Sequence, residues 1–271
     1  MTTHDIKKKP FIVCGHRGYA GKYPENTMTG FVAAAELGVD MIELDVVMSR
    51  DGIPVISHDY EIDRTSDGTG LFADYTLEEL LGYDYAAKSD KAVCPERLCT
   101  FEDVCLLLKK YPELMLNIDM KNDEGPICNK VADIVEKYGY HDRVIFNGLG
   151  GSGLAQMADR GFYVEASPDG FYGMANFDKL FNENCAKAKA LCFNANQHVT
   201  KENVERLKDR YGVEVWAWCS NWDGYSTDDN GVKQPVQCEA CMENMIRCGV
   251  TMALCNYPDA AIAYLKRKGI R

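Results

Sequence analysis

The chain contains no apolar run that approaches the roughly 20 residues of a membrane-spanning helix. It also lacks an excess of basic residues, because 30 Lys and Arg stand against 41 Asp and Glu, for a net charge of −11. Broad nucleic-acid binding and adhesion to an anionic membrane both need a basic surface. No apolar stretch long enough for a signal peptide follows the first residues, MTTHDIKKKP. The sequence therefore predicts no nucleic-acid partner, no membrane span and a cytoplasmic location.

Cysteine is too sparse for a disulfide-based fold. The 12 cysteines make up about 4% of the chain, below the roughly 8–10% of disulfide scaffolds. Cys238 and Cys241 form a CxxC pair, but neither a second pair nor a suitably spaced histidine completes a zinc site. We expect reduced, buried thiols, with a redox or metal role for that one pair as the alternative.

Strand-like and helix-like segments alternate along the chain, and 46% of the residues are hydrophobic, enough for a sizeable core. Eight strands, each followed by a helix, predict a (β/α)₈ barrel as a single domain over residues 1–271. The competing doubly wound sheet needs a Gly-rich fingerprint after the first strand, which is absent. Strands are predicted at Phe11–Cys14, Met41–Val47, Leu114–Met120, Val144–Phe146, Phe162–Ala166, Ala190–Phe193, Val213–Cys219 and Val250–Leu254. Helices are predicted at Met28–Leu37, Phe101–Lys110, Ile127–Tyr138, Gly153–Arg160, Phe177–Ala186, Lys201–Tyr211, Glu239–Cys248 and Asp259–Lys268.

A short run, Ile53–Ser57, interrupts the alternation. It follows the second strand too closely for a parallel crossover, and the Asp51-Gly52 pair between them is a strong hairpin signal. We therefore expect the second strand to extend past the barrel and turn back, which places His58 opposite Asp45 or its neighbour Leu44. The following stretch, about residues 60–100, is predicted to be a small insertion over one end of the barrel.

Acidic residues concentrate at the second strand and the hairpin. Residues 40–67 carry eight acids and two bases. Glu43 and Asp45 have the i, i+2 spacing that places both side chains on one face of a strand, inside the barrel near its carboxyl-end mouth. Buried carboxylates need compensation, and a hard cation such as Mg²⁺ or Ca²⁺ provides it. In the alternative, one acid pairs with Arg17 and the other is solvated.

Further polar residues are expected at the same mouth. Asp119 and Lys121 share one face of the strand LNIDMK. Asp119 is therefore a candidate third metal ligand, and Lys121 offers a positive charge to an anionic substrate. The alternative is a plain salt bridge between the two side chains inside the barrel.

His16 and Arg17 directly follow the first strand, and His58 returns by the hairpin. Two histidines, two cations and a carboxylate-bound metal indicate acid–base chemistry on a phosphate ester. We expect His4, His141 and His198 to have surface or capping roles.

Several long blocks of the sequence resemble the glycerophosphodiester phosphodiesterase family. The matching blocks are GHRGYAGKYPENT, ELDVVMSRDGIPVISHD, DRTSDGTG with DYTLEEL, LNIDMK, VWAW and GVTMALCNYPD. The resemblance extends from Phe11 to Leu265 and implies a barrel fold with an insertion after the hairpin.

The resemblance also implies a role for each matching residue. It implies that His16 and His58 are the acid–base pair and that Arg17 and Lys121 contact the phosphate. It implies that the metal carboxylates are Glu43, Asp45 and Asp119.

The chain departs from the family pattern in ways that bear on the substrate. Asp119 stands where the family usually has a glutamate, so we expect an interposed water or a shifted metal. The family's VWTVN-like motif reads VWAWCSN, with Trp216 kept and expected to form a wall of the pocket. Thr251 and Asn256 occupy two positions that are usually acidic, and an unusual loop covers residues 221–237.

Together these features predict a metal-dependent phosphodiesterase that releases glycerol 3-phosphate and an alcohol from a glycerophosphodiester. One alternative is a related barrel that stops at a cyclic phosphate. Another is a non-catalytic barrel that binds a phosphate ligand, although binding alone does not require two histidines. The head group, the physiological metal, the acid and base roles of the histidines and the oligomeric state stay open.

Overall fold

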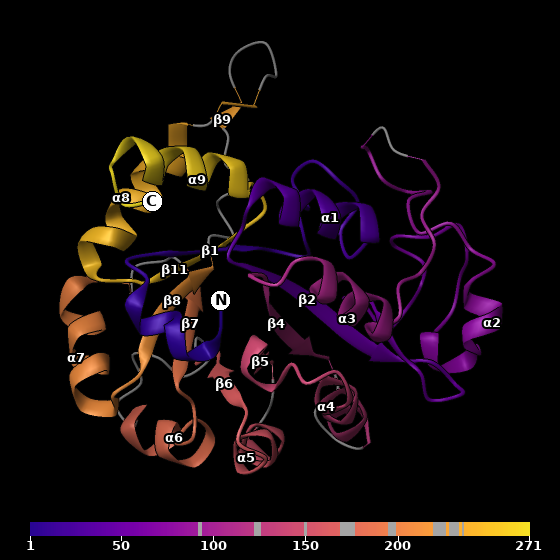
Figure 1. Ribbon diagram of the computed structural model, residues 1–271, viewed down its shortest axis with the longest axis horizontal. Coiled ribbons are helices and arrows are strands. Elements are labelled where there is room, and N and C mark those ends of the chain that lie inside the picture. Colours follow the sequence, from indigo (N-terminus) through magenta and orange to yellow (C-terminus); the bar gives the residue numbers. More distant parts are fainter. Residues whose placement is uncertain are drawn as a thin grey trace.

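Eight parallel strands close into a barrel with helices around it (Figure 1). The structure, a computed structural model, describes residues 1–91, 94–121, 126–148, 151–168, 177–194, 199–218, 226–227, 233–234 and 236–271. The ring runs β1-β2-β4-β5-β6-β7-β8-β11 and closes because β11 pairs with β1. This confirms the predicted (β/α)₈ barrel. The barrel strands are β1 (Ile12–Gly15), β2 (Met41–Met48), β4 (Met115–Met120), β5 (Val144–Asn147), β6 (Tyr163–Ala166), β7 (Ala190–Asn194), β8 (Glu214–Trp218) and β11 (Met252–Cys255).

Each predicted helix is also present, with ends that differ by up to three residues. The helices are α1 (Met28–Leu37), α3 (Phe101–Lys110), α4 (Ile127–Lys137), α5 (Gly151–Asp159), α6 (Phe177–Asn184), α7 (Lys201–Tyr211), α8 (Val236–Cys248) and α9 (Pro258–Arg267). Thr100 and Thr200 cap α3 and α7, where each threonine side chain accepts a backbone N–H three residues on. In the described part of the chain, no helix is both long and apolar enough to cross a bilayer.

Side chains that point into the barrel are apolar in its lower half. Met41, Met115, Ile145, Trp216 and others form this layer, and Met1 and Ile6 close it from below, at the amino ends of the strands. Ile6 belongs to the short helix η1 (Thr3–Lys8). The alternate side chains of the strands pack outward on the helices. Because the lower half is filled, only the upper half has room for a site.

Asp40, at the amino end of β2, ties the bottom of the barrel together. Its carboxylate accepts the Val13 N–H at 2.9 Å and pairs with Lys9 and Arg271. We expect Asp40→Ala to lower the free energy of unfolding by about 2–4 kcal/mol, because a buried N–H and two cations lose their partner. Urea unfolding measures this, with the exposed Asp142→Ala at the same end as control. Equal losses in both variants would contradict the role of Asp40.

The second strand extends beyond the barrel as predicted. β2 pairs antiparallel with β3 (Pro54–Ile56), with Val46 opposite Ile56, and Ser57 N–H donates to the Asp45 carbonyl at 3.0 Å. His58 therefore comes next to Asp45 and Leu44. The hairpin thus returns the second histidine to the carboxylates.

The insertion after β3 lies beyond the ring of helices on the β2 side (Figure 1). It contains η2 (Phe72–Asp74) and α2 (Leu77–Leu80). Its apolar side chains form a core of their own around Phe72, built on Val47 and Val55 of the hairpin. Phe72, Tyr75, Tyr83 and Tyr85 therefore pack on the hairpin and not in the barrel.

Ten cysteines are described, and all but Cys94 and Cys241 are buried. This agrees with the expected burial of the thiols. The side chain of Cys238 is not among those described, so the role of the CxxC pair stays a prediction. His198 lies outside the described residues, as does most of the loop at 221–237, of which β9 (Ser226–Thr227) and β10 (Lys233–Gln234) form an antiparallel pair.

Candidate active site

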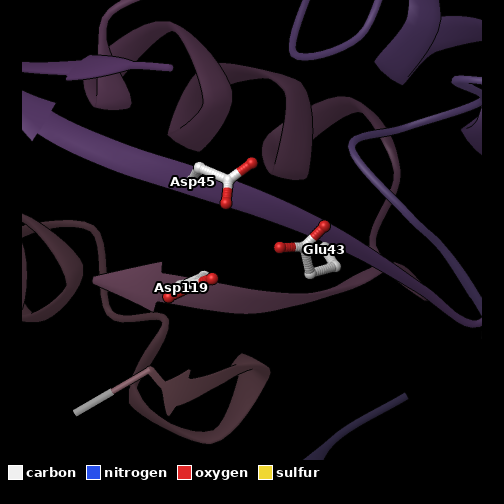
Figure 2. Close-up of side chains that lie close together, drawn as sticks. All are labelled: Glu43, Asp45 and Asp119. Atoms are coloured by element: carbon white, nitrogen blue, oxygen red, sulfur yellow. The ribbon is translucent and has the colours of Figure 1, made fainter. Parts of the chain in front are cut away.

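Three carboxylates meet at the carboxyl ends of two neighbouring barrel strands. Glu43 and Asp45 project from one face of β2, and Asp119 projects from β4 as the register partner of Asp45 (Figure 2). One oxygen from each lies within 4.8 Å of the others, and Glu43 and Asp45 are buried. Burial, and then the charges of Asp45 and Asp119, raise the pKa of Glu43 well above its ordinary value. The cluster is thus rich in negative charge, and its all-oxygen donor set fits a hard divalent cation.

Two cationic side chains lie against Asp45. Arg17 Nε is 3.2 Å from one carboxylate oxygen and Lys121 Nζ is 2.8 Å from the other. Lys121 Nζ is also 2.5 Å from Asp119. Burial opposes ionisation of Asp45, but the charges of Arg17 and Lys121 outweigh it and lower the pKa. The ion pairs considered as alternatives are therefore present, although Glu43 is buried rather than solvated.

The loop between β1 and α1 supports the carboxylates through Arg17 and through Asn26, which the sequence analysis did not single out. Asn26 Nδ2 donates to Asp45 at 2.8 Å, and the Arg17 N–H donates to Glu43 at 2.9 Å. Arg17 and Asn26 have φ values of 50° and 56°, in the left-handed region. Backbone strain of this kind clusters at functional sites. The PENT motif contains Asn26 and is the sequence feature from which a role of this residue in the site could have been predicted.

His16 lies deep in the site. Its Nδ1 is 2.7 Å from Asn256 Oδ1, and its Nε2 is 3.9 Å from Glu43. Because an amide oxygen only accepts, the proton is on Nδ1 and the lone pair on Nε2. Burial, and then the charge of Arg17, lower the pKa of His16 to about 4. The imidazole is therefore neutral near pH 7.

His58 has a different partner and is more exposed. Its Nδ1 is 2.6 Å from a carboxylate oxygen of Asp59, which also pairs with Arg64. Arg64 belongs to the insertion and forms two hydrogen bonds with Glu25, which in turn pairs with Arg17. A chain of ion pairs thus joins the insertion to the site. Asp59 and Arg64 follow His58 closely in the sequence, but only the fold shows that they support it.

The predicted residues line one cavity of about 360 Å³ at the barrel mouth, with one exception. His16, Arg17, Glu43, Asp45, His58, Asp119 and Lys121 all contribute to it. The cavity is completed by Asn147, Glu165, Ser167, Cys192, Phe193, Trp218 and Leu254.

The exception is Trp216, and this prediction was wrong. Trp216 is fully buried in the apolar lower half, where its ring is stacked 6.0 Å from that of Tyr163. Trp218 lies two residues further along β8, on the same face and one layer higher, and its ring is 5.4 Å from that of His16. The i, i+2 period of a strand gives two residues the same face but different depths. Trp218 therefore forms the wall.

Solved structures share this fold. The glycerophosphodiester phosphodiesterase of Agrobacterium tumefaciens has a TM-score of 0.73 and 21% identity, over 93% of this chain and 99% of that one. A phosphodiesterase of Oleispira antarctica, solved with its product sn-glycerol-3-phosphate, has a TM-score of 0.75 and 19% identity, over 98% of this chain and 100% of that one.

Curated proteins are similar over a shorter part of the chain. The glycerophosphodiester phosphodiesterase of Caldanaerobacter subterraneus is 36% identical over 139 residues, covering 50% of this chain and 57% of that protein. Lysophospholipase D of Mus musculus is 33% identical over 142 residues, covering 50% of this chain and 45% of that protein. The match thus spans less than two thirds of these relatives. The model of the glycerophosphoryl diester phosphodiesterase family matches residues 16–260, nearly the whole chain. The chain belongs to the glycerophosphoryl diester phosphodiesterase family.

Proposed function

We propose that this protein hydrolyses glycerophosphodiesters to glycerol 3-phosphate and an alcohol. The observation that carries the proposal is the convergence of two histidines, two cations and three carboxylates on one cavity in a member of this family. The product named in the Oleispira antarctica structure supports it.

Glu43, Asp45 and Asp119 would hold one divalent cation, Mg²⁺ or Ca²⁺. Such an ion neutralises a phosphate oxygen and polarises an attacking hydroxyl. Arg17 and Lys121, which lie beside the same carboxylates, bind the phosphate. Arg17 offers a planar fork that matches phosphate oxygens, and Lys121 offers a compact charge. Both stabilise the negative charge that grows in the transition state.

The contacts of the two histidines favour different roles. His16 presents the lone pair of Nε2 and has a neutral amide partner, Asn256, so it accepts the proton of the attacking hydroxyl. His58 has a carboxylate partner, Asp59, at Nδ1, which leaves Nε2 of the ring for the substrate. We assign to His58 the donation of a proton to the leaving oxygen. The attacking hydroxyl comes from water or from the neighbouring glycerol, and the second case gives a cyclic phosphate.

A second substrate class, lysophospholipids, is favoured by an apolar pocket beside the mouth. The pocket has a volume of about 370 Å³ and is lined by Val47, Tyr60, Phe72 and Ile127, among others. Val47 follows Asp45 on the same face of β2, and the Tyr60 hydroxyl donates to the Lys121 carbonyl. An acyl chain on the substrate fits such a pocket, and the mouse relative is a lysophospholipase D.

Turnover of a panel of substrates with Mg²⁺ or Ca²⁺, followed by phosphorus NMR, tests the proposal. We expect glycerophosphocholine or glycerophosphoethanolamine to give glycerol 3-phosphate. A lasting cyclic phosphate would identify a lyase, and binding without turnover would identify the non-catalytic barrel. Higher kcat/KM for lysophosphatidylcholine than for glycerophosphocholine would favour the second substrate class.

A further inference from the structure

A buried carboxyl group outside the proposed machinery lines the same cavity. Glu165 is on β6, only 2% exposed, on a different wall from the metal carboxylates. Its hydrogen-bond partners are neutral: Asn117 Nδ2 donates to Oε2 at 2.6 Å, and the thiol of Cys192 is the other donor. Burial raises the pKa of Glu165 to about 7. Burying an acid without a cation is costly, so its place at a ligand cavity points to a use there.

Asn117 holds Glu165 in place. Asn117 is completely buried on β4, two residues before Asp119 and beside Glu43 in the register. Its amide nitrogen faces Glu165, while its Oδ1 has no hydrogen-bond partner among the described residues. A carboxylate has about four acceptor positions, and the two donors found among the described residues leave part of that capacity unused. Glu165 can therefore accept a further hydrogen bond from a ligand in the cavity.

The surroundings of Glu165 indicate what that ligand is. Ser167 and Asn147 also line the cavity, so the described residues on the wall formed by β5 and β6 are polar and include no Lys or Arg. Phe193, Trp218 and Leu254 form an apolar wall beyond it. β4 and β6 are two strand spacings apart, about 10 Å, which is about the length of a phosphate ester with a short carbon chain. A short carbon chain that carries hydroxyl groups fits this cavity, because the hydroxyl groups can face the polar wall and the carbon atoms the apolar wall.

We propose that Glu165 determines specificity for the glycerol half of the substrate, by accepting a hydrogen bond from a glycerol hydroxyl group, with Asn117 as its positioning residue. This inference rests on the proposed function and deepens it. A site built to hydrogen-bond a hydroxyl discriminates strongly against an analogue that lacks it. Glu165 thus separates glycerol esters from other phosphate esters and leaves the bond-breaking step to other residues.

Calorimetric binding of sn-glycerol 3-phosphate and of methyl phosphate to the metal-loaded protein tests the inference without turnover. We expect the preference for glycerol 3-phosphate to fall roughly 10²-fold in Glu165→Met. Glu165→Gln keeps the shape and an oxygen for Asn117 but turns an amide donor toward the cavity, so we expect a loss of roughly 10-fold. Glu214→Gln is the matched control, because Glu214 begins β8 at the opposite end and its partner is Thr251.

Kinetics separate specificity from a structural role. In Glu165→Met, kcat/KM should fall for glycerophosphocholine and change less than threefold for bis(p-nitrophenyl) phosphate, which has no glycerol. Proportional losses for both substrates and both ligands, or no loss for either, would overturn the inference. If Glu165→Met does not fold, the same comparison of the two substrates and the two ligands is made with Glu165→Gln. A wild-type protein that never turns over a glycerophosphodiester contradicts the proposed function instead, while the ratio of binding constants still reports on Glu165.

Discussion

His16→Ala and His58→Ala should each lower kcat on an unactivated glycerophosphodiester by at least roughly 10²-fold, because a positioned acid or base contributes about 10²–10⁴-fold. Each imidazole has its own fixed partner, Asn256 for His16 and Asp59 for His58, so neither replaces the other. Metal binding and folding should be largely intact. The double variant should lose less than the product of the two effects, because the histidines act as a unit.

A change of leaving group assigns the two roles. A p-nitrophenyl ester needs little protonation when it leaves, so it should partly rescue the variant that lacks the general acid. The contacts predict rescue of His58→Ala and not of His16→Ala. The opposite pattern would reverse the assignment, and near-normal turnover of either single variant on glycerophosphocholine would refute the two-histidine mechanism. His141→Ala is a control, since that ring is stacked on Phe162, away from the cavity.

The parts of the site that the sequence predicts well are those fixed by local geometry. The period of a strand places Glu43 with Asp45, and Asp119 with Lys121, on common faces. The Asp51-Gly52 turn sets the hairpin register, which brings His58 to Asp45. Each of these inferences needs only a few consecutive residues.

The parts that the sequence does not predict depend on depth and on distant partners. Trp216 and Trp218 share a face, and only the closed barrel shows which of them reaches the cavity. Asn256 meets His16 because β11 closes the ring against β1, and that pairing joins opposite ends of the chain. The sequence analysis did not identify Glu165, because a single acidic residue in a short apolar strand looks like an interruption of the strand pattern. Its role in the cavity emerges only when Asn117 is seen to hold it.

Asp45→Asn should lower the affinity for a divalent cation by at least roughly 10²-fold, because loss of a charged ligand costs more than the 10–100-fold typical of its supporting groups. Asp45 is central to the cluster: it pairs with Arg17 and Lys121 and accepts a hydrogen bond from Asn26. Without its charge, both cations lie beside a metal site that has only two carboxylates. Activity at ordinary metal concentrations should fall with affinity, and EDTA should abolish activity in the wild type.

Binding of the ion can be measured apart from turnover. A ligand at 100 times its Kd stabilises the folded state by about 2.7 kcal/mol, so Mg²⁺ or Ca²⁺ should raise the Tm of the wild type. The same concentration should raise the Tm of Asp45→Asn much less, because it no longer exceeds Kd by that factor. Glu36→Gln, an exposed change on α1, should respond like the wild type. Full activity of metal-free protein, or an equal rise in Tm for Asp45→Asn and wild type, would remove the metal from the mechanism. Arg17 and Lys121 would then be the only fixed positive charges that face the phosphate from the described residues of the cavity.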